Sequence, residues 1–439
     1  QPHQVCLRRL ARERAEARFV YLLARIRFAR KVGDMNILIV TTGGITRVFR
    51  NWPEVLLAKA LVRRGHTVRA FTYYDAKSDA LSTRAENIDG VEVERIQENG
   101  WLTREFWYAL TRAPKPDVIH IQHLRNKFAF QAAYYAQREN IPYVVTPIGP
   151  LHDQYLSRDR DRPLDTEPLY HNLIWSRREI LNRAARDGRV KRHVENYLMH
   201  YPAHHADMVI ACSEHERGIW RKLGIESETI PLWVDAPFIA NLRGEKFQRE
   251  FSRPVILFVG QFKYRKGFDV LARAMPEVLR DFPNATFLFV GHSPIHRREL
   301  EWIAKKDGTS EHLQILERVS EEDKVRLYNS ADAYVLPTRY EGFGLPPLEA
   351  MAAGCPVIAS DIPVVDEVVQ HEYNGLLVPR DNPRALAQTI ARMLRDENLC
   401  ARLIQNGFET LKRFDENDLT ARNENVYARA MQQREAVAL

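Results

Sequence analysis

Two glutamates flank a glycine-rich corner in the most informative stretch of the chain. Gly342 and Gly344 follow Glu341, a helix is predicted to begin near Pro346, and Glu349 lies within that helix. Glycine lets backbone amides approach a ligand closely, and a helix N-terminus presents free N–H groups and the positive end of its dipole. The corner therefore suits a diphosphate, while the carboxylates suit sugar or ribose hydroxyls. A solvated strand–loop–helix corner is the alternative.

A second set of candidate ligands follows the predicted strand Val255–Val259. The turn after this strand contains Gln261, Lys263, Arg265 and Lys266. Lysine and arginine at a strand-to-helix turn are typical phosphate ligands. The alternative for Lys266 is a lysine of an exposed loop.

Weaker candidates follow predicted strands in the first half of the chain. Gly43 and Gly44 come after the first strand, His120 and His123 close another strand, and His152 follows a third. Turns use glycine in many settings, and a single histidine at a strand end is as often structural as functional. Spacing alone therefore leaves these residues open.

The predicted elements indicate how these candidates are positioned. From Met35 onward, short apolar runs alternate with amphipathic stretches, which is typical of βαβ units with a parallel sheet. Strands are predicted at 36–40, 68–72, 118–121, 143–146 and 208–211, and in a second series at 255–259, 286–290, 313–316, 333–336 and 357–359. Helices are predicted at 214–223, 268–280, 295–305, 321–329 and 383–395. We therefore expect two Rossmann-like doubly wound α/β domains that face each other across a cleft at their strand carboxyl ends.

The boundaries follow from this order. We expect a basic N-terminal extension at 1–34, a first Rossmann-like domain at 35–232, a hinge at 233–253 and a second Rossmann-like domain at 254–414. Residues 415–439 are predicted to form a helix that packs back on the first domain.

Charge and composition exclude several classes of protein. Counting Lys, Arg, Asp and Glu, residues 1–34 hold +6 of the net charge of +7, so no basic surface for nucleic acid is expected in the rest. No apolar run approaches the ~18 residues of a membrane-spanning helix. The four cysteines lie far apart and predict neither a disulfide framework nor a zinc site, so a cytoplasmic protein is expected.

Two interpretations of residues 1–34 remain open. The segment forms either a basic amphipathic helix on an anionic membrane surface or a simple extension before Met35. A signal peptide is not expected.

The glutamate stretch resembles the Glu-x7-Glu signature of the family-4 retaining glycosyltransferases, which have the GT-B fold and use nucleotide-diphosphate sugars. The likeness covers Met35 to about Tyr427. It implies that Glu349 binds the donor ribose and that Glu341 lies at the transferred sugar and its phosphate. It also implies that the sugar and diphosphate are held by backbone amides of Gly342, Phe343, Gly344 and Leu345.

The resemblance extends to the lysine turn, where the family usually has Gly-Arg followed five residues later by Lys-Gly. Lys266 matches the lysine, but Gln261 stands in place of the arginine. Either Lys263 or Arg265 supplies the missing cation, or the site binds its donor more weakly.

On the acceptor side the match is less complete. By resemblance, Gly43 and Gly44 form the glycine loop that approaches the donor phosphate and the acceptor. The family often places a cleft histidine one position before His123, which makes His123 a candidate. Ile148 stands where a Thr-Pro-His-Gly acceptor loop has its histidine, and His152 is a candidate replacement.

The resemblance thus implies metal-independent, retaining transfer of a sugar from a UDP- or GDP-type donor to a carbohydrate or lipid-linked acceptor in glycoconjugate synthesis. Glu341, Lys266 and His123 are the expected catalytic residues, and no covalent nucleophile is evident. No metal or other cofactor and no nucleic-acid partner is expected beyond the nucleotide sugar as co-substrate. Peripheral contact with the inner face of a membrane is left open.

Other functions remain as alternatives. A nucleotide-sugar epimerase or a non-catalytic nucleotide-sugar-binding protein would share this fold. Asp159 and Asp161 match a metal-binding Asp-x-Asp pair but follow no strand, and His200 and His204 lack the glutamate of a metalloprotease motif. A dinucleotide oxidoreductase is disfavoured, because no Gly-x-Gly-x-x-Gly opens the first helix.

Overall fold

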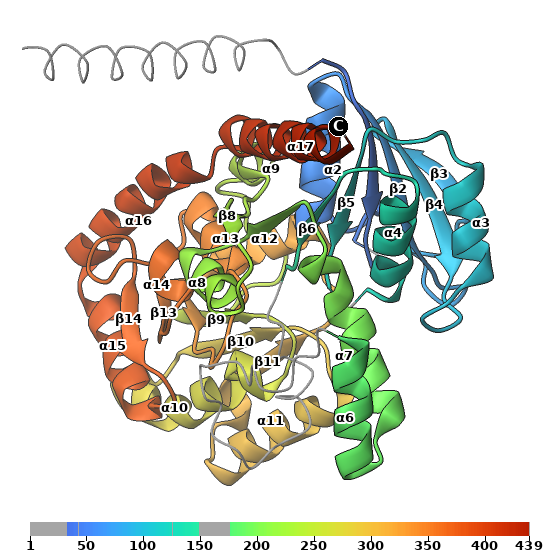
Figure 1. Cartoon of the computed structure of the whole chain (residues 1–439). Helices are drawn as coiled ribbons and strands as arrows, with labels where there is room; N and C mark the ends of the chain where they lie inside the picture. The colour runs from blue at the N-terminus through green and yellow to red at the C-terminus, as the bar shows by residue number, and fades with distance from the viewer. Residues whose placement is uncertain (1–32, 43, 125, 149–175, 439) are drawn as a thin grey trace, which may run out of the picture. The chain divides into compact units, whose positions relative to one another are not determined.

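The computed structural model describes residues 33–438 except 43, 125 and 149–175 (Figure 1). The described residues from Asn36 onward form one compact unit. Gly43, His152, the Asp159–Asp161 pair and nearly all of the basic N-terminal extension lie outside the described residues.

The first half contains an eight-stranded sheet in the order β3-β4-β2-β1-β5-β6-β7-β8, counted over the described residues. Every neighbouring pair is parallel except β3 and β4, which are antiparallel. The strands are β1 (Asn36–Val40), β2 (Thr67–Tyr74), β3 (Ala85–Ile88), β4 (Val91–Gln97), β5 (Val118–Gln122), β6 (Tyr143–Thr146), β7 (Met208–Ala211) and β8 (Ser227–Thr229). All five strands predicted for this half are confirmed within two residues; β3, β4 and β8 were not predicted.

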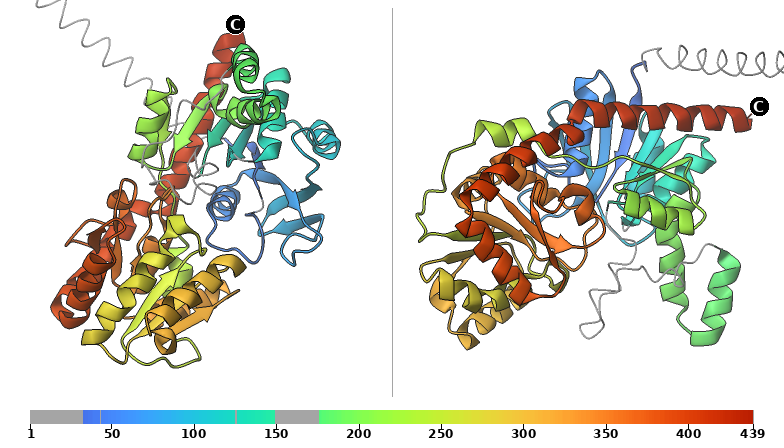
Figure 2. Two further views of the ribbon diagram at one scale, coloured as in Figure 1. Left: turned by 90° about the horizontal axis from the view of Figure 1, so that it is seen from below. Right: turned by 90° about the vertical axis from the view of Figure 1, so that its left-hand side faces the viewer.

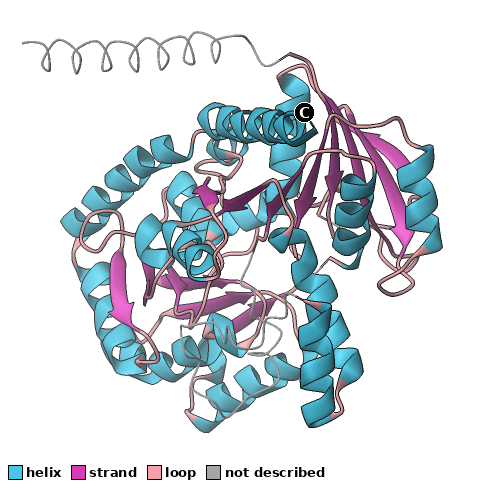
Figure 3. Ribbon diagram, in the orientation of Figure 1, coloured by secondary structure: helices cyan, strands magenta, loops and turns pink. Residues whose placement is uncertain are grey.

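The helices of the first half are α2 (Pro53–Arg63), α3 (Arg104–Arg112), α4 (Lys127–Arg138), α6 (Arg177–Asp187), α7 (Val190–His204) and α8 (Glu214–Lys222). Helices α2, α3, α4 and α8 pack on this sheet, whereas α7 packs on α4 and α6 packs on α7 (Figure 3). Side chains cap three helices of the first half, because Asn126 accepts from the backbone of Phe128, Ser176 from that of Glu179 and Ser213 from that of Glu216. The helix predicted at 214–223 is confirmed as α8.

The second half contains a six-stranded, all-parallel sheet in the order β11-β10-β9-β12-β13-β14. Its strands are β9 (Val255–Val259), β10 (Thr286–Val290), β11 (Leu313–Leu316), β12 (Ala333–Leu336), β13 (Val357–Asp361) and β14 (Leu376–Pro379). In terms of chain order this is 3-2-1-4-5-6, the order of dinucleotide-binding sheets. The order reverses beside β9, so ligands of such a sheet bind where the carboxyl ends of β9 and β12 meet.

The helices that follow these strands are α10 (Phe268–Asp281), α11 (Pro294–Lys306), α12 (Glu321–Ser330), α13 (Leu345–Ala353), α14 (Val365–Val368), α15 (Pro383–Arg395) and α16 (Glu397–Leu411). Short 3-10 turns lie at η2 (Tyr264–Lys266), η3 (Ser310–His312) and η4 (Lys412–Phe414), and α9 (Ala236–Asn241) lies between the two sheets in the chain. A core formed by residues such as Phe258, Phe289 and Leu271 joins sheet and helices. The fold prediction of two Rossmann-like α/β domains is thus confirmed.

The last helix, α17 (Glu416–Ala438), returns to the first half and lies beside α2 and β6 (Figures 1 and 2). Glu424 accepts hydrogen bonds from Arg64 at 2.5 and 2.8 Å and lies 2.9 Å from His66 Nε2. Burial works to raise the pKa of Glu424, but these hydrogen bonds and charges lower it overall.

Candidate functional site

The glycine corner joins the carboxyl end of β12 to the N-terminus of α13. The helix begins at Leu345, one residue before the predicted position, with Gly344 as its N-cap at φ 102°. Only glycine adopts that conformation readily, which fixes Gly344 at the bend. The Phe343 side chain is buried and packs edge-on against Phe414 at 6.0 Å. The corner therefore offers its backbone to a ligand, and the aromatic ring anchors it from behind.

The lysine turn is tied to this corner through its backbone. The carbonyl of Arg265 accepts a hydrogen bond from the Thr338 hydroxyl and another from the backbone N–H of Arg339, both at 2.7 Å. Gly267 has φ 72°, and a Cβ at this position would lie 1.8 Å from the carbonyl oxygen of Pro337. The turn after β9 and the loop after β12 are thus in direct contact, and only a glycine permits it.

Lys266 and Glu341 meet across that contact. Lys266 Nζ lies 2.6 Å from Glu341 Oε1, and Arg265 lies 3.9 Å from the other carboxylate oxygen. Glu341 is only 5% exposed, so its charge is offset within the protein. Gln261 and Lys263 of the same turn are exposed.

Glu349 is held by two residues of α12. Lys324 Nζ donates to Glu349 Oε1 at 2.8 Å, and the Tyr328 hydroxyl donates to Oε2 at 3.0 Å. Lys324 also pairs with Glu321 at 2.9 Å. Burial works to lower the pKa of Lys324, but the charges of both glutamates raise it overall, so the lysine stays charged.

The two acidic side chains share a neighbour in Tyr334 of β12. Burial raises the pKa of this hydroxyl well above its usual value, and the charges of Glu341 and Glu349 raise it further. Both carboxylates therefore lie near the same buried phenol. Of the residues predicted for this site, the structure brings Lys266 into contact with Glu341, and it places Glu349 in the helix that follows the glycine corner.

The first half contributes a polar contact to the Lys324 cluster. Asn51, which precedes α2, donates to Glu321 at 3.4 Å and accepts from the backbone N–H of Asp235 at 2.9 Å. The two halves thus meet close to the residues that hold Glu349.

The strand ends of the first sheet hold a second acid–base pair. His123, directly after β5, lies with Nε2 2.7 Å from Glu54 Oε1 and Nδ1 3.2 Å from the carbonyl oxygen of Ile148. Glu54 lies in the first turn of α2, is fully buried, and accepts from the Thr41 hydroxyl at 3.2 Å. Gly44 is buried beside this pair.

His120 is a correction to the sequence prediction, which placed it on the acceptor side. It is 0% exposed within β5, and its ring nitrogens lie 2.7 Å from the Tyr427 and Thr146 hydroxyls. Burial lowers the pKa of His120 to about 3, so it is neutral. His120 connects α17 to the sheet and has no free nitrogen for an acceptor.

Each half of the chain matches a known protein family. Residues 43–233 match the family model described as "Glycosyl transferase 4-like domain", and residues 244–410 match "Glycosyl transferases group 1". Both halves are therefore glycosyltransferase domains.

Relatives and solved structures agree with that assignment. A phosphatidyl-myo-inositol mannosyltransferase of Mycobacterium leprae is 34% identical over 174 residues, which is 39% of this chain and 46% of the relative. The chain spans about half the length of the curated relatives it matches.

Among structures, sucrose-phosphate synthase from Thermosynechococcus elongatus matches with a TM-score of 0.69 at 22% identity, covering 91% of this chain and 99% of that one. Anabaena Alr3699/HepE in complex with UDP and glucose matches with a TM-score of 0.64 at 18% identity, covering 90% of this chain and 99% of that one. Structural neighbours of this kind have the GT-B fold, in agreement with the prediction.

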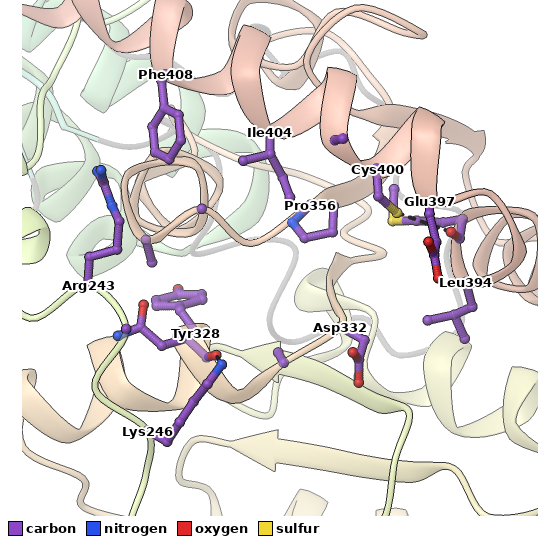
Figure 4. Close-up of a pocket in the computed structure, with 17 residues that line it drawn as sticks. Arg243, Lys246, Tyr328, Asp332, Pro356, Leu394, Glu397, Cys400, Ile404 and Phe408 are labelled. Carbon is purple, nitrogen blue, oxygen red and sulfur yellow. Dashed lines mark hydrogen bonds between the residues drawn. The ribbon is translucent and has the colours of Figure 1, made fainter.

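The second glycosyltransferase domain also contains an open pocket of about 690 Å³ (Figure 4). Asp332 and Pro356, which line it, precede β12 and β13, so the cavity opens at the amino ends of the strands. Tyr328 also lines it, while the hydroxyl of Tyr328 reaches Glu349. The cavity therefore lies behind the glycine corner, on the opposite edge of the sheet from the expected donor site.

Two further properties concern the described part of the glycosyltransferase domains. Within it, no three His, Cys, Asp or Glu side chains are grouped so that they could hold a metal ion. No helix there is both long enough and apolar enough to cross a bilayer.

Sequence reasoning missed Lys324, Tyr328, Glu321 and Glu54. A helix is predicted at 321–329, and the Glu321–Lys324 spacing of three residues places both on one face of that helix. That spacing was the available signal for the cluster. No comparable local signal pointed to Glu54.

Proposed function

We propose that this protein is a retaining glycosyltransferase that moves a sugar from a nucleotide-diphosphate donor to a hydroxyl acceptor. The observation that carries the proposal is the contact of Lys266 with Glu341 at 2.6 Å beside the glycine corner. A cation, free backbone amides and a carboxylate are the groups needed to bind the phosphate and hydroxyls of one nucleotide sugar.

The second half binds the donor in this proposal. Glu349 accepts hydrogen bonds from the ribose hydroxyls, with its position fixed by Lys324 and Tyr328. Glu341 lies at the transferred sugar, and when the diphosphate enters, Lys266 exchanges part of its contact with Glu341 for a phosphate oxygen. Backbone amides of Gly342 to Leu345 and the side chains of Lys263 and Arg265 complete the anion site, with Gln261 as a neutral member.

The reaction follows from where charge develops. As the glycosidic bond to the diphosphate breaks, negative charge grows on the leaving phosphate, and fixed cations and amides stabilise that charge more in the transition state than in the ground state. The departing phosphate takes the proton of the acceptor hydroxyl on the same face of the sugar, which retains the configuration. This step uses no metal ion.

The donor and acceptor classes rest on relatives. HepE structures contain UDP and UDP-glucose, so we propose a UDP-type donor first and a GDP-type donor second. A relative named as a phosphatidyl-myo-inositol mannosyltransferase supports a lipid-linked or polyol acceptor bound by the first half, near His123 and Gly44.

Two measurements test the proposal. A nucleotide sugar that binds the folded state must raise the melting temperature, so a thermal-shift panel of UDP- and GDP-sugars identifies the donor. NMR of the product formed with that donor, with and without EDTA, then reports the anomeric configuration and any need for a metal. Failure of every donor to bind would refute the proposal, and an altered donor sugar without transfer would indicate an epimerase.

A further inference from the structure

The ring of His123 faces two hydrogen-bond acceptors. Its Nε2 lies 2.7 Å from a carboxylate oxygen of Glu54, and its Nδ1 lies 3.2 Å from the backbone carbonyl of Ile148. A carbonyl or an ionised carboxylate only accepts, so each ring nitrogen must carry a proton for both contacts to be hydrogen bonds. A ring with two N–H groups is a cation without a free lone pair.

Glu54 is built to be an anion opposite that ring. It lies in the first turn of α2, where the positive end of the helix dipole favours a carboxylate. Burial alone raises the pKa of Glu54. The charge and hydrogen bond of His123 lower that pKa overall, together with the backbone hydrogen bond of Glu54 and the hydrogen bond from the Thr41 hydroxyl. Among the described residues, the charged group that forms a hydrogen bond with the His123 ring is the carboxylate of Glu54.

Gly44 has a role in this pair that does not depend on its backbone conformation. A Cβ at this position would lie 2.4 Å from Glu54 Oε1, 2.6 Å from Cδ and 2.8 Å from Oε2. Real Cβ atoms do not approach so closely, and a fully buried carboxylate has little room to move. A side chain at position 44 would displace Glu54 and thereby the ring of His123.

We propose that Glu54 is a positioning residue that holds His123 as a doubly protonated imidazolium at the carboxyl edge of the first sheet. His123 is then a fixed cation that faces the substrate, and it cannot take a proton from the acceptor. Gly44 leaves the space that Glu54 needs. The statement that His123 faces the substrate rests on the glycosyltransferase function proposed above. In that function, the first half adds a positive charge near the anionic donor. This charge complements the lysine turn of the second half, where Gln261 stands in place of a cation.

The protonation state is measured without any substrate. In the full-length chain with labelled histidine, ¹H–¹⁵N NMR at pH 8 should show both ring nitrogens of His123 protonated, and the signal is assigned by its loss in His123→Gln. In Glu54→Gln and in Gly44→Ala it should change to a neutral ring. His120 serves as an internal control, because it is buried against two hydroxyls and should stay neutral in every variant.

A neutral His123 in the unmodified protein at pH 8 would overturn the proposal, whether or not the variants fold. An unchanged cation in folded Glu54→Gln would overturn the role of Glu54, and an unchanged cation in folded Gly44→Ala would overturn that of Gly44.

A pH profile tests the consequence for turnover. Relative to the unmodified enzyme, Glu54→Gln should lose more activity at pH 8 than at pH 6, because the ring then lacks the carboxylate that holds its second proton, whereas a merely structural defect lowers activity equally at both. Equal losses would contradict the role in turnover. If the unmodified chain shows no turnover, the proposed function fails while the NMR result stands separately.

Discussion

Replacing Tyr328 with phenylalanine removes one oxygen atom from the support of Glu349. In the structure that hydroxyl donates at 3.0 Å to a carboxylate that is 4% exposed, inside a fully buried aromatic pair with Tyr334. The ring shape is kept, so no cavity of consequence forms. The variant therefore isolates the hydrogen bond.

The expected magnitude follows from the charge of the acceptor. A hydrogen bond to a charged group contributes about 1.5–3 kcal/mol. If about 1.4 kcal/mol of this orients Glu349 for the ribose, the dissociation constant of the donor rises about tenfold. The measurement is isothermal titration calorimetry with the nucleotide sugar that most raises the melting temperature, well below the melting temperature of the variant.

Tyr334→Phe is the matched control. Tyr334 is equally buried and its ring lies edge-on to Tyr328 at 5.4 Å, but its hydroxyl has no hydrogen-bond partner in the part of the chain that is described. Removing an unpaired buried hydroxyl should leave donor affinity within about twofold and stability equal or higher. Equal loss of affinity in both variants, or none in Tyr328→Phe, would refute the role given to Tyr328.

Three further predictions concern stability and are measured by chemical denaturation. Lys324→Met leaves the buried Glu349 and the partly buried Glu321 without their shared cation and should cost about 3–5 kcal/mol; no loss of stability would contradict this role of Lys324. Gly267→Ala places a Cβ 1.8 Å from the Pro337 carbonyl and should destabilise the chain by more than about 1 kcal/mol, whereas Gly188→Ala, at φ 68° but with nothing within 4 Å, should cost less. Burial raises the pKa of Glu216 from 4.5 to about 7, so the folded state holds a proton that the unfolded state releases. The stabilisation from protonated Glu216 is therefore present below pH 4.5, and about 3 kcal/mol of it is lost as the pH rises to 7. Glu216→Gln should remove this pH-dependent loss of stability. An unchanged pH dependence in the variant would contradict the assignment to Glu216.

The strands were predictable where they are buried on both faces. A parallel strand covered by helices is a continuous apolar run, as in β9 and β10, and both were predicted with their observed bounds. The β3–β4 hairpin was missed, because its strands alternate buried residues with charged ones such as Glu92 and Glu94. Short alternating segments are less distinctive than a buried run.

The candidate site was predictable where its residues share a local motif. The glycine corner and the lysine turn each lie within one short stretch. The supports of Glu349 come from residues 21 and 25 positions away, and Glu54 is 69 positions from His123. His120 was misassigned because its partner Tyr427 lies 307 positions along the chain. Contacts of this range depend on the packing of whole elements, which periodicity does not specify.

We propose that Lys266, the glycine corner and the two acidic side chains bind one pyrophosphate-linked sugar. Calorimetric titration of the selected nucleotide sugar into the unmodified protein, Lys266→Met and Lys263→Met compares the lysine that contacts Glu341 with an exposed lysine of the same turn. Binding should weaken by at least about tenfold in Lys266→Met and by less in Lys263→Met. Equal affinity of Lys266→Met and the unmodified protein would contradict it.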